Sequence, residues 1–262
     1  MPLYTADALI LRTYKLAESD RIVVFLTSDR GKRRGVARGA RKTRSRFGGG
    51  LEPFTRARVE YFEREQRDLV RLSYVEPVAS PLSCSSGDVL EHVSYFAELV
   101  DAWALEADPN DTLYRLGASV VDALIAGLPV DRVARYFEYW LLRIQGVYPS
   151  LVSCHECGST LEGGGAIARA TGVLRCRRCG VDTSDVDLPA DAVAFLRGAA
   201  RVRPERVGEL TLSGQGARQL AIAHRALIAM HLDRDLRSAR VLRELGAGLS
   251  NSPNPAKTEF VS

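Results

Sequence analysis

The stretch RIVVFLTSDRGKRRGVARGA, residues 21–40, has the pattern of two strands joined by a turn. Its first part, 21–28, is rich in β-branched residues, and the Asp-Arg-Gly sequence at 29–31 supplies the turn. In the second part Val36 lies between Arg34 and Arg38, so apolar and charged positions alternate. A period of two residues is typical of a strand with one buried face, and the stretch therefore predicts two neighbouring β-strands.

Three more stretches near the N-terminus show the same alternation: ADALILRTY (6–14), FTRARVEYFE (54–63) and DLVRLSYVE (68–76). Turn residues separate them, and Pro77 and Pro81 close the run. Five strands within about 75 residues match the strand count of an oligonucleotide-binding (OB) barrel, so we predict a small antiparallel barrel of OB type. An SH3-like barrel shares this pattern and stays open as an alternative.

From residue 87 the apolar period becomes that of a helix, with a stripe formed by Val89, Val93, Phe96, Val100 and Trp103. Further helices are expected over 111–127, 133–146, 189–200 and 214–232, and a shorter one around 237–246. The predicted fold is thus an α+β chain of several modules. These are an OB domain over residues 1–80, a helical domain over 81–248 and a disordered tail over 249–262.

Composition and charge narrow the function classes. The 262 residues are 46% hydrophobic and 26% charged, which excludes wholesale disorder and fibrous structure. No uninterrupted apolar run is long enough for a membrane helix, and the N-terminus lacks the pattern of a signal peptide, so we expect a cytoplasmic protein. Net charge is +7 over residues 1–80, −6 over 81–150 and +3 over 151–262. This asymmetry indicates that the first module faces a polyanion.

Four of the five cysteines form two pairs, Cys154 with Cys157 and Cys176 with Cys179, separated by eighteen residues. This spacing is typical of a four-thiolate zinc knuckle, here over about 150–185, and four thiolates leave no open position for a substrate. We therefore predict one structural Zn²⁺ per chain. Reduced thiols without an ion, or a redox pair, are the alternatives. Cys84 stands alone and is expected to be buried as a small apolar residue.

The run from Arg30 to Phe47 contains nine basic residues and no acid. Arginine predominates, and its planar guanidinium suits phosphate oxygens and stacks on bases. The predicted DNA-binding residues are Lys32, Arg33, Arg34, Arg38, Arg41, Lys42, Arg44 and Arg46. A merely solvated charged face is the alternative. Phe47, with Tyr61 or Phe62, could stack on bases or belong to the barrel core.

Catalytic signatures are missing from the sequence. It has no phosphate-binding G-x-x-x-x-G-K-[ST], no G-x-G-x-x-G, no H-E-x-x-H and no G-x-S-x-G, so we predict that the protein is not an enzyme. Asp182, Asp185 and Asp187 could hold Mg²⁺ in a nuclease, but a solvated loop is the simpler interpretation. His224 and His231 lie on an apolar helix and are expected to be ordinary, partly buried histidines.

The order of these parts resembles the RecO family of bacterial recombination mediators over nearly the whole chain. The N-terminal block carries E18-S-D20-R21, L26-T27, G31-K32, A37-R38-G39 and S45-R46 at matching places. R135-Y-F-E138, G146-V-Y-P149 and C154…C157-G158 are similar to the helix and knuckle that follow in the family, and L236-R237-S238 to a later step. Arg237 stands where lysine is more usual.

This resemblance implies an OB barrel, a helical domain with a zinc knuckle, and a non-enzymatic role in DNA repair through the RecF pathway. Such proteins bind single- and double-stranded DNA, anneal complementary strands, partner RecR, and bind the acidic C-terminal tail of single-stranded-DNA-binding protein (SSB). Together they help to load RecA onto SSB-coated DNA, which implies a cytoplasmic, nucleoid-associated protein. The alternatives are an RNA-binding or ribosome-associated OB/zinc-ribbon protein and a metal-dependent nuclease.

A binding site for the SSB tail requires an apolar pocket with one or two fixed cations. Within the acidic segment 81–150, Arg132 and Arg135 lie three residues apart beside several aromatic residues, and we take them as the candidates. Arg135 also falls in the segment that resembles the family. The alternative is that these arginines pair with nearby acids such as Asp131 and Glu138.

Overall fold

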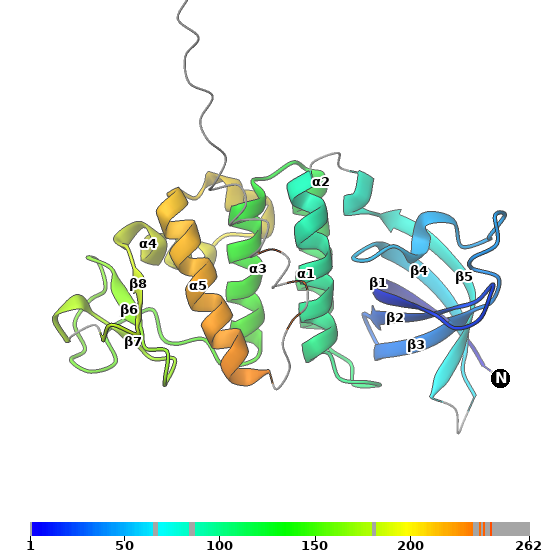
Figure 1. The fold of residues 1–262 in the computed structure, drawn as a ribbon, viewed down its shortest axis with the longest axis horizontal. Helices are drawn as coiled ribbons and strands as arrows, with labels where there is room; N and C mark the ends of the chain where they lie inside the picture. The colour runs from blue at the N-terminus through cyan, green and yellow to red at the C-terminus, as the bar shows by residue number, and fades with distance from the viewer. Residues whose placement is uncertain are drawn as a thin grey trace, which may run out of the picture.

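The computed structural model describes residues 2–64, 68–83, 87–179 and 182–232, together with Leu236, Ser238 and Leu242. Its first part is a five-stranded barrel (Figure 1), with strands β1 (Leu3–Lys15), β2 (Arg21–Thr27), β3 (Gly31–Ala37), β4 (Arg56–Phe62) and β5 (Leu69–Ala79). The strands close in the order β1-β2-β3-β5-β4, with β4 paired to β1. The predicted OB-type barrel is therefore confirmed.

One strand pair differs from the all-antiparallel prediction. β3 and β5 run parallel, with Gly35 opposite Val70, whereas the other four pairs are antiparallel. The chain leaves β3, crosses the barrel end through the short helix η1 (Gly48–Leu51), and forms the β4–β5 hairpin before it reaches β3 again. Alternation along single strands cannot reveal this return, because a parallel and an antiparallel strand can bury the same face.

Each strand of the barrel has two different faces. The inward face forms a closed core that includes Ile10, Phe25, Val59, Tyr61 and Leu72. The outward face of β1 and β2 is also apolar, and it packs with the helices in a second core through Leu9, Leu11, Val24, Leu26 and Phe54. The barrel and the helical part therefore share one continuous buried contact, which we call the seam.

The helical part consists of α1 (Gly87–Trp103), α2 (Asp111–Ile125), α3 (Val130–Ile144), α4 (Ala190–Ala199) and α5 (Gly214–His231), with short helices η2 (Pro81–Ser83) and η4 (Pro204–Glu209). The Asn110 side chain accepts a hydrogen bond from the Leu113 amide and caps α2. Phe54 from the barrel, Phe96 from α1 and Phe137 from α3 stack together, with centroids 4.8 to 6.3 Å apart. This aromatic group centres the core on the seam.

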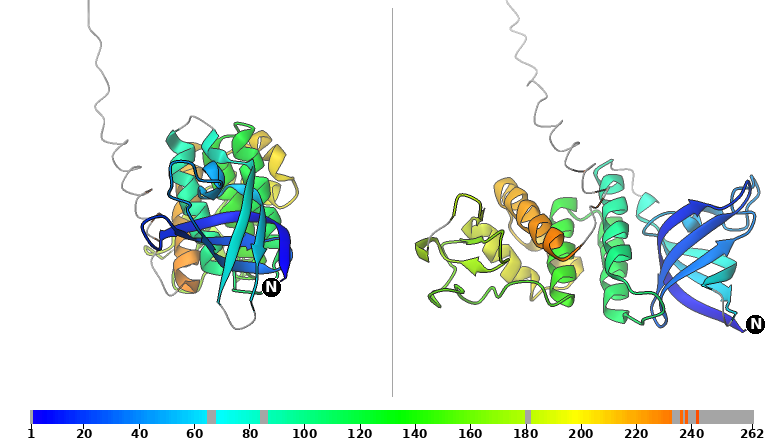
Figure 2. Two further views of the ribbon diagram at one scale, coloured as in Figure 1. Left: turned by 90° about the vertical axis from the view of Figure 1, so that its right-hand side faces the viewer. Right: turned by 60° about the horizontal axis from the view of Figure 1, so that its bottom comes forward.

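Beyond α3 the chain forms a small knuckle on a three-stranded sheet of order β7-β6-β8, with β6 (Gly165–Ile167), β7 (Leu174–Arg175), β8 (Val186–Leu188) and the helix η3 (Arg177–Cys179). α5 packs against β8 and α3, so the knuckle lies at the end of the molecule away from the barrel (Figures 1 and 2). Across the described residues, no helix combines the length and apolarity needed to cross a membrane.

Beyond Leu232 the chain is described at only three residues, Leu236, Ser238 and Leu242. Leu236 is buried, and the Ser238 amide donates to Glu98 Oε2 at 2.8 Å, so this segment returns to α1. The helix expected around 237–246 lies largely outside the described residues, as do the tail over 249–262 and Cys84. The domain limits at 80 and 248 stay predictions.

Candidate functional site

Charged side chains reinforce the seam. Lys32 Nζ donates to the Asp101 carbonyl at 2.8 Å and lies 3.3 Å from its carboxylate, while Arg12 reaches the same carboxylate at 3.2 Å. Arg34 pairs with Glu106 at 2.6 Å. Lys32 is buried by these contacts and is not available on an open surface, whereas the Arg34–Glu106 pair is exposed, with the Arg34 side chain 53% accessible.

A loop of exposed cations occupies the opposite end of the barrel. We define the basic loop as residues 38–47, between β3 and η1. It carries five exposed basic side chains, Arg38, Arg41, Lys42, Arg44 and Arg46. Together with the β1–β2 turn, the loop lines an open hollow of about 410 Å³. Figures 1 and 2 show that both segments lie at the end of the barrel that points away from the helices.

The basic loop is held in place by its neighbour, the β1–β2 turn. Asp20 Oδ1 accepts a hydrogen bond from the Gly39 amide at 2.8 Å, and this bond lowers the pKa of the Asp20 carboxyl. Gly39 has a φ of +71°, which a residue with a side chain rarely adopts. The Arg41 amide donates to the Ser19 carbonyl at 2.9 Å, and the Arg41 guanidinium donates to the Glu18 carbonyl at 2.9 Å. The loop therefore presents its charges from a fixed backbone.

The structure does not bring the first three predicted DNA-binding residues to this surface. Lys32 is buried at the seam, Arg33 is half-buried beside Glu63 at 3.4 Å, and Arg34 is exposed but paired with Glu106. The structure also decides between base stacking and the barrel core as the role of the aromatic residues. Phe47 and Tyr61 are buried in the barrel core, and Phe62 is half-buried with Arg71 over its ring.

The four cysteines of the knuckle converge on one point. Their Sγ atoms all lie within 4.8 Å of one another, and the distances from Cys176 to Cys157 and to Cys179 are 3.6 and 3.7 Å. A tetrahedral zinc ion with Zn–S bonds of about 2.3 Å requires sulfur atoms about 3.8 Å apart. The site therefore has the shape of a closed four-thiolate metal centre, and the sulfur atoms are too far apart for disulfides. Hydrogen bonding by Ser159 lowers the pKa of the Cys157 thiol to about 6, whereas hydrogen bonding by Cys157 raises the pKa of the Cys179 thiol to about 12, so Cys179 has to release a proton when a metal binds.

The aspartates near the knuckle do not form a second centre. Asp187 pairs with Arg177 at 3.2 Å, and Asp185 accepts a hydrogen bond from the Asp182 amide. In the described part of the chain, the four cysteines are the one group of potential metal ligands that gathers closely enough.

The expectation that Arg135 lies in a surface pocket is wrong. Arg135 is 8% exposed, and its guanidinium lies 3.0 Å from Glu138 Oε1, which is 1% exposed. Arg132 points elsewhere and donates to the Gly208 carbonyl at 2.6 Å. The alternative of pairing with Glu138 is correct for Arg135, but the pair is buried and not on the surface. A ligand carboxylate at Arg135 would have to displace this pair from the core.

Glu138 is the centre of a buried polar network that joins three helices. Its Oε1 accepts from Tyr95 of α1 at 2.9 Å as well as from Arg135, and its Oε2 lies 2.8 Å from His224 Nδ1 of α5. Tyr148 lies 2.8 Å from His224 Nε2. Burial lowers the pKa of His224 and raises that of Tyr148, so a neutral imidazole donates to Glu138 and accepts from the tyrosine hydroxyl.

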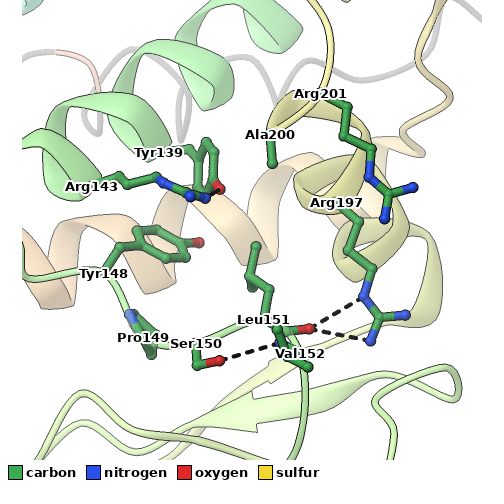
Figure 3. Close-up of a pocket in the computed structure, with 10 residues that line it drawn as sticks. All are labelled: Tyr139, Arg143, Tyr148, Pro149, Ser150, Leu151, Val152, Arg197, Ala200 and Arg201. Atoms are coloured by element: carbon green, nitrogen blue, oxygen red, sulfur yellow. Dashed lines mark hydrogen bonds between the residues drawn. The ribbon is translucent and has the colours of Figure 1, made fainter.

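A different place in the helical part does combine an apolar surface with cations. Figure 3 shows a hollow of about 490 Å³, the arginine pocket, between α3, α4 and the loop 148–152. Tyr139, Tyr148, Leu151 and Val152 supply apolar surface, and three arginines surround it: Arg143, Arg197 and Arg201.

The three arginines of the pocket differ in how many hydrogen bonds their side chains already make. Arg143 donates to the Tyr139 hydroxyl at 2.5 Å and stacks on Trp140, and Arg197 donates twice to the Leu151 carbonyl, at 3.2 and 3.3 Å. Among the described residues, the exposed Arg201 side chain has no partner. Arg143 lies on α3, whereas Arg197 lies on α4 and Arg201 just after its end, more than fifty residues later, so only packing brings them together.

The comparisons with known proteins cover both parts of the chain. Residues 1–81 match the family model "Recombination protein O N terminal", and residues 85–240 match "Recombination protein O C terminal". The chain is 39% identical to the DNA repair protein RecO of Koribacter versatilis over 60% of this chain and 64% of that protein. It is 35% identical to RecO of Anaeromyxobacter sp. over 90% and 94%, and 30% identical to RecO of Pelotomaculum thermopropionicum over 96% and 98%.

Proposed function

The chain belongs to the RecO family, and from that premise we propose that it is a non-enzymatic, DNA-binding recombination mediator that works in DNA repair. The observation that carries the proposal is the basic loop, five exposed cations on a fixed backbone at the free end of an OB-type barrel. OB barrels bind oligonucleotides through one face and its loops. The relatives' shared name, DNA repair protein, supports the process in which this surface acts.

The basic loop binds the phosphate backbone, with no preference for sequence. Arginine and lysine release counterions from DNA when they bind, so affinity falls steeply with salt. The same neutralisation lowers the repulsion between two phosphate backbones, which gives a physical basis for annealing complementary strands. Arg38, Arg41, Lys42, Arg44 and Arg46 form this surface, whereas Lys32 is buried against Asp101 and Arg33 and Arg34 pair with Glu63 and Glu106. RNA has the same phosphates, so a competition between DNA and RNA separates this proposal from the RNA-binding alternative.

The experiment for the DNA surface is a salt titration. We expect the triple variant Arg38→Ala, Lys42→Ala and Arg44→Ala to reduce the slope of log K against log salt for single-stranded DNA by about 2, at about 0.7 per lost phosphate contact. Strand annealing slows in parallel. The matched control replaces three exposed arginines elsewhere, Arg115, Arg206 and Arg218, with alanine and keeps the wild-type slope. If both variants have the same slope, the DNA surface lies outside the basic loop.

We further propose that the four cysteines hold one structural zinc ion. The sulfur distances and the closed donor set support zinc over Mg²⁺ or Ca²⁺, which prefer oxygen ligands. When bound, the ion crosslinks the two cysteine turns and leaves no position for a substrate. Metal analysis of the purified protein tests the site, with an expected content of about one zinc per chain.

The arginine pocket is our proposed site for the acidic, carboxylate-ended tail of SSB. It has the required combination of apolar surface and fixed cations, and the free Arg201 can pair with a carboxylate in two parallel hydrogen bonds. Arg201→Glu is expected to weaken binding of the tail peptide at least tenfold, or about 1.4 kcal/mol, with DNA annealing unchanged in the absence of SSB. Arg115→Glu on α2 is the control. Equal peptide affinity of the two variants would exclude Arg201 from the site.

The remaining steps follow from the family role. Bound to RecR and recruited by SSB, the protein helps RecA to replace SSB on single-stranded DNA, and it works in the cytoplasm at the nucleoid. A pull-down with RecR and the SSB tail peptide tests both partners. If neither binds and DNA incubated with Mg²⁺ is cut, a nuclease would be the better interpretation.

A further inference from the structure

The arginine pocket and the metal centre share one short stretch of chain. The loop 148–152 forms the wall of the pocket opposite α4, and Cys154 follows two residues after Val152 (Figure 3). Whatever fixes Cys154 in space therefore also limits where the pocket wall can lie.

On its pocket side, this stretch is fixed by two contacts with the helices. The Tyr148 hydroxyl reaches His224 of α5 at 2.8 Å, and the Leu151 carbonyl accepts both bonds of Arg197 from α4. Between these contacts and the knuckle, the Val152 side chain is 78% exposed. Tyr148 and Leu151 pack against the helical core, whereas Val152 has little packing of its own, so its position depends on what holds Leu151 and Cys154.

On its knuckle side, the stretch is fixed by the first cysteine turn. The Cys154 amide donates to the Ser159 carbonyl at 2.8 Å, and the His155 amide donates to the Leu174 carbonyl of β7 at 3.0 Å. The strand β7 has only two residues, so few backbone bonds tie this turn to the one that contains Cys176 and Cys179. A half-exposed ion pair between Glu156 and Arg175, at 3.3 Å, is a further contact between the two turns.

We propose that the metal centre positions the wall of the arginine pocket, so that metal ion and acidic peptide bind this protein cooperatively. The proposal rests on the pocket's proposed role as a peptide site. A metal ion that joins Cys154 to the second turn removes the freedom of 149–153 before the peptide arrives, and the peptide then does not have to order the wall itself. The knuckle thereby contributes to peptide binding as well as to the stability of the fold.

Such coupling is reciprocal by thermodynamic necessity. If the ion strengthens peptide binding by a given factor, saturating peptide must strengthen metal binding by the same factor. We expect a factor of about ten, within the usual range of about 5 to 150 for coupled sites. The two measurements use different readouts, so one checks the other.

The experiment uses the full chain and a fluorescent acidic nonapeptide that ends in phenylalanine with a free carboxylate. Anisotropy gives the peptide affinity of zinc-loaded and chelator-stripped protein, with circular dichroism to verify the fold. A competition with a colorimetric chelator gives zinc affinity with and without saturating peptide. We expect about tenfold weaker peptide binding after stripping and about tenfold tighter zinc in the presence of peptide.

A second variant keeps the test decisive if the stripped protein unfolds. Two glycines inserted between Val152 and Ser153 leave all four cysteines in place but disconnect the wall from the knuckle. We expect one zinc per chain, a native circular dichroism spectrum, about tenfold weaker peptide binding and no effect of peptide on zinc. Two glycines inserted in the exposed turn after Gly163 are the control and preserve both affinities.

The outcomes separate the two proposals. Loaded wild-type protein that does not bind the peptide refutes the peptide site itself. Peptide binding that is equal, within twofold, in loaded and stripped folded protein, or in wild type and the Val152 insertion, refutes the coupling and leaves the peptide site standing.

Discussion

Replacing Glu138 with leucine should remove the centre of the buried network at almost constant volume. The variant leaves the Arg135 guanidinium, 8% exposed, without its anion, and leaves Tyr95 and His224 without an acceptor. Loss of one partner of a buried ion pair costs about 3–5 kcal/mol, mostly because the remaining charge stays desolvated. At about 2–4 °C per kcal/mol for a chain of this size, the melting temperature should fall by about 6–20 °C.

The chain provides a matched control for this experiment. Arg206 and Glu209 form an ion pair at the same spacing of three residues and at 2.7 Å, but both side chains are exposed. Glu209→Leu should leave the urea midpoint close to that of the wild type, because exposed pairs contribute little. Adding Arg135→Met to Glu138→Leu should recover part of the loss, since no uncompensated charge then remains.

The same network sets a pH dependence. Burial raises the pKa of Glu138, but Arg135, His224 and Tyr95 outweigh it, and the net pKa lies below the ordinary value of 4.5. Glu138 therefore stabilises the fold above about pH 4.5, and this contribution is lost as the pH falls through its lower folded pKa. Burial lowers the pKa of His224 below 6.5, so stability also declines as the pH falls from about 6.5, where only the unfolded chain takes up the proton.

Urea unfolding at several pH values, followed by circular dichroism, measures these effects. The wild type should lose stability as the pH falls from about 7 to well below 4.5, and Glu138→Leu should lack the part of that decline that lies below about pH 4.5. A loss below about 1 kcal/mol at pH 7 for Glu138→Leu would contradict the argument, because it would mean that Arg135 can reach water in the folded protein.

Three further outcomes can be checked directly. Gly31→Ala should reduce thermal stability markedly, because Gly31 has a φ of +70° and a Cβ there would lie 2.1 Å from the Asp108 carbonyl oxygen. Differential scanning calorimetry measures the melting temperature, and an unchanged value would contradict the packing at the seam. Asp20→Ala should free the Gly39 amide and make the basic loop more susceptible to trypsin than in the wild type, with equal cleavage rates as the opposing result. Cys176→Ser should lose zinc and helical-domain stability together, measured by metal analysis and urea unfolding, whereas full zinc content would exclude this thiol as a ligand.

The fold could be predicted largely from local patterns. Turn signals and period-two alternation locate the barrel strands, and apolar stripes locate α1 to α5, because a single buried face imposes its period on the sequence. The exception is β2, which is buried on both faces and is located by its run of β-branched residues. The cysteine spacing predicts the convergence of the four sulfur atoms for a similar reason, since two tight turns can meet at one ion. The parallel contact of β3 with β5 has no such local sign, because it depends on the path of the chain between them.

The charge pattern of the sequence predicted the binding sites less well than the apolar pattern predicted the fold. Lys32 and Arg135 look like exposed cations in the sequence, but both are buried. Lys32 pairs with Asp101, which is distant in the sequence, and Arg135 pairs with Glu138, one helical turn further along. The sequence cannot distinguish a cation that meets a ligand from one that meets its own fold, because both lie beside apolar residues. The arginine pocket was missed for the complementary reason: Tyr148, Arg197 and Arg201 become neighbours only after α4 packs near α3.

The seam has a mechanical consequence for the two proposed binding surfaces. Leu9, Leu11, Val24, Leu26 and Phe54 join barrel and helices in one core, so the two parts cannot swing as beads on a linker. The basic loop lies at one end of this rod, and the arginine pocket lies toward the other (Figure 1). If the arginine pocket holds a peptide, the basic loop stays at a fixed distance from that peptide. The basic loop can then reach only the DNA that lies within this distance.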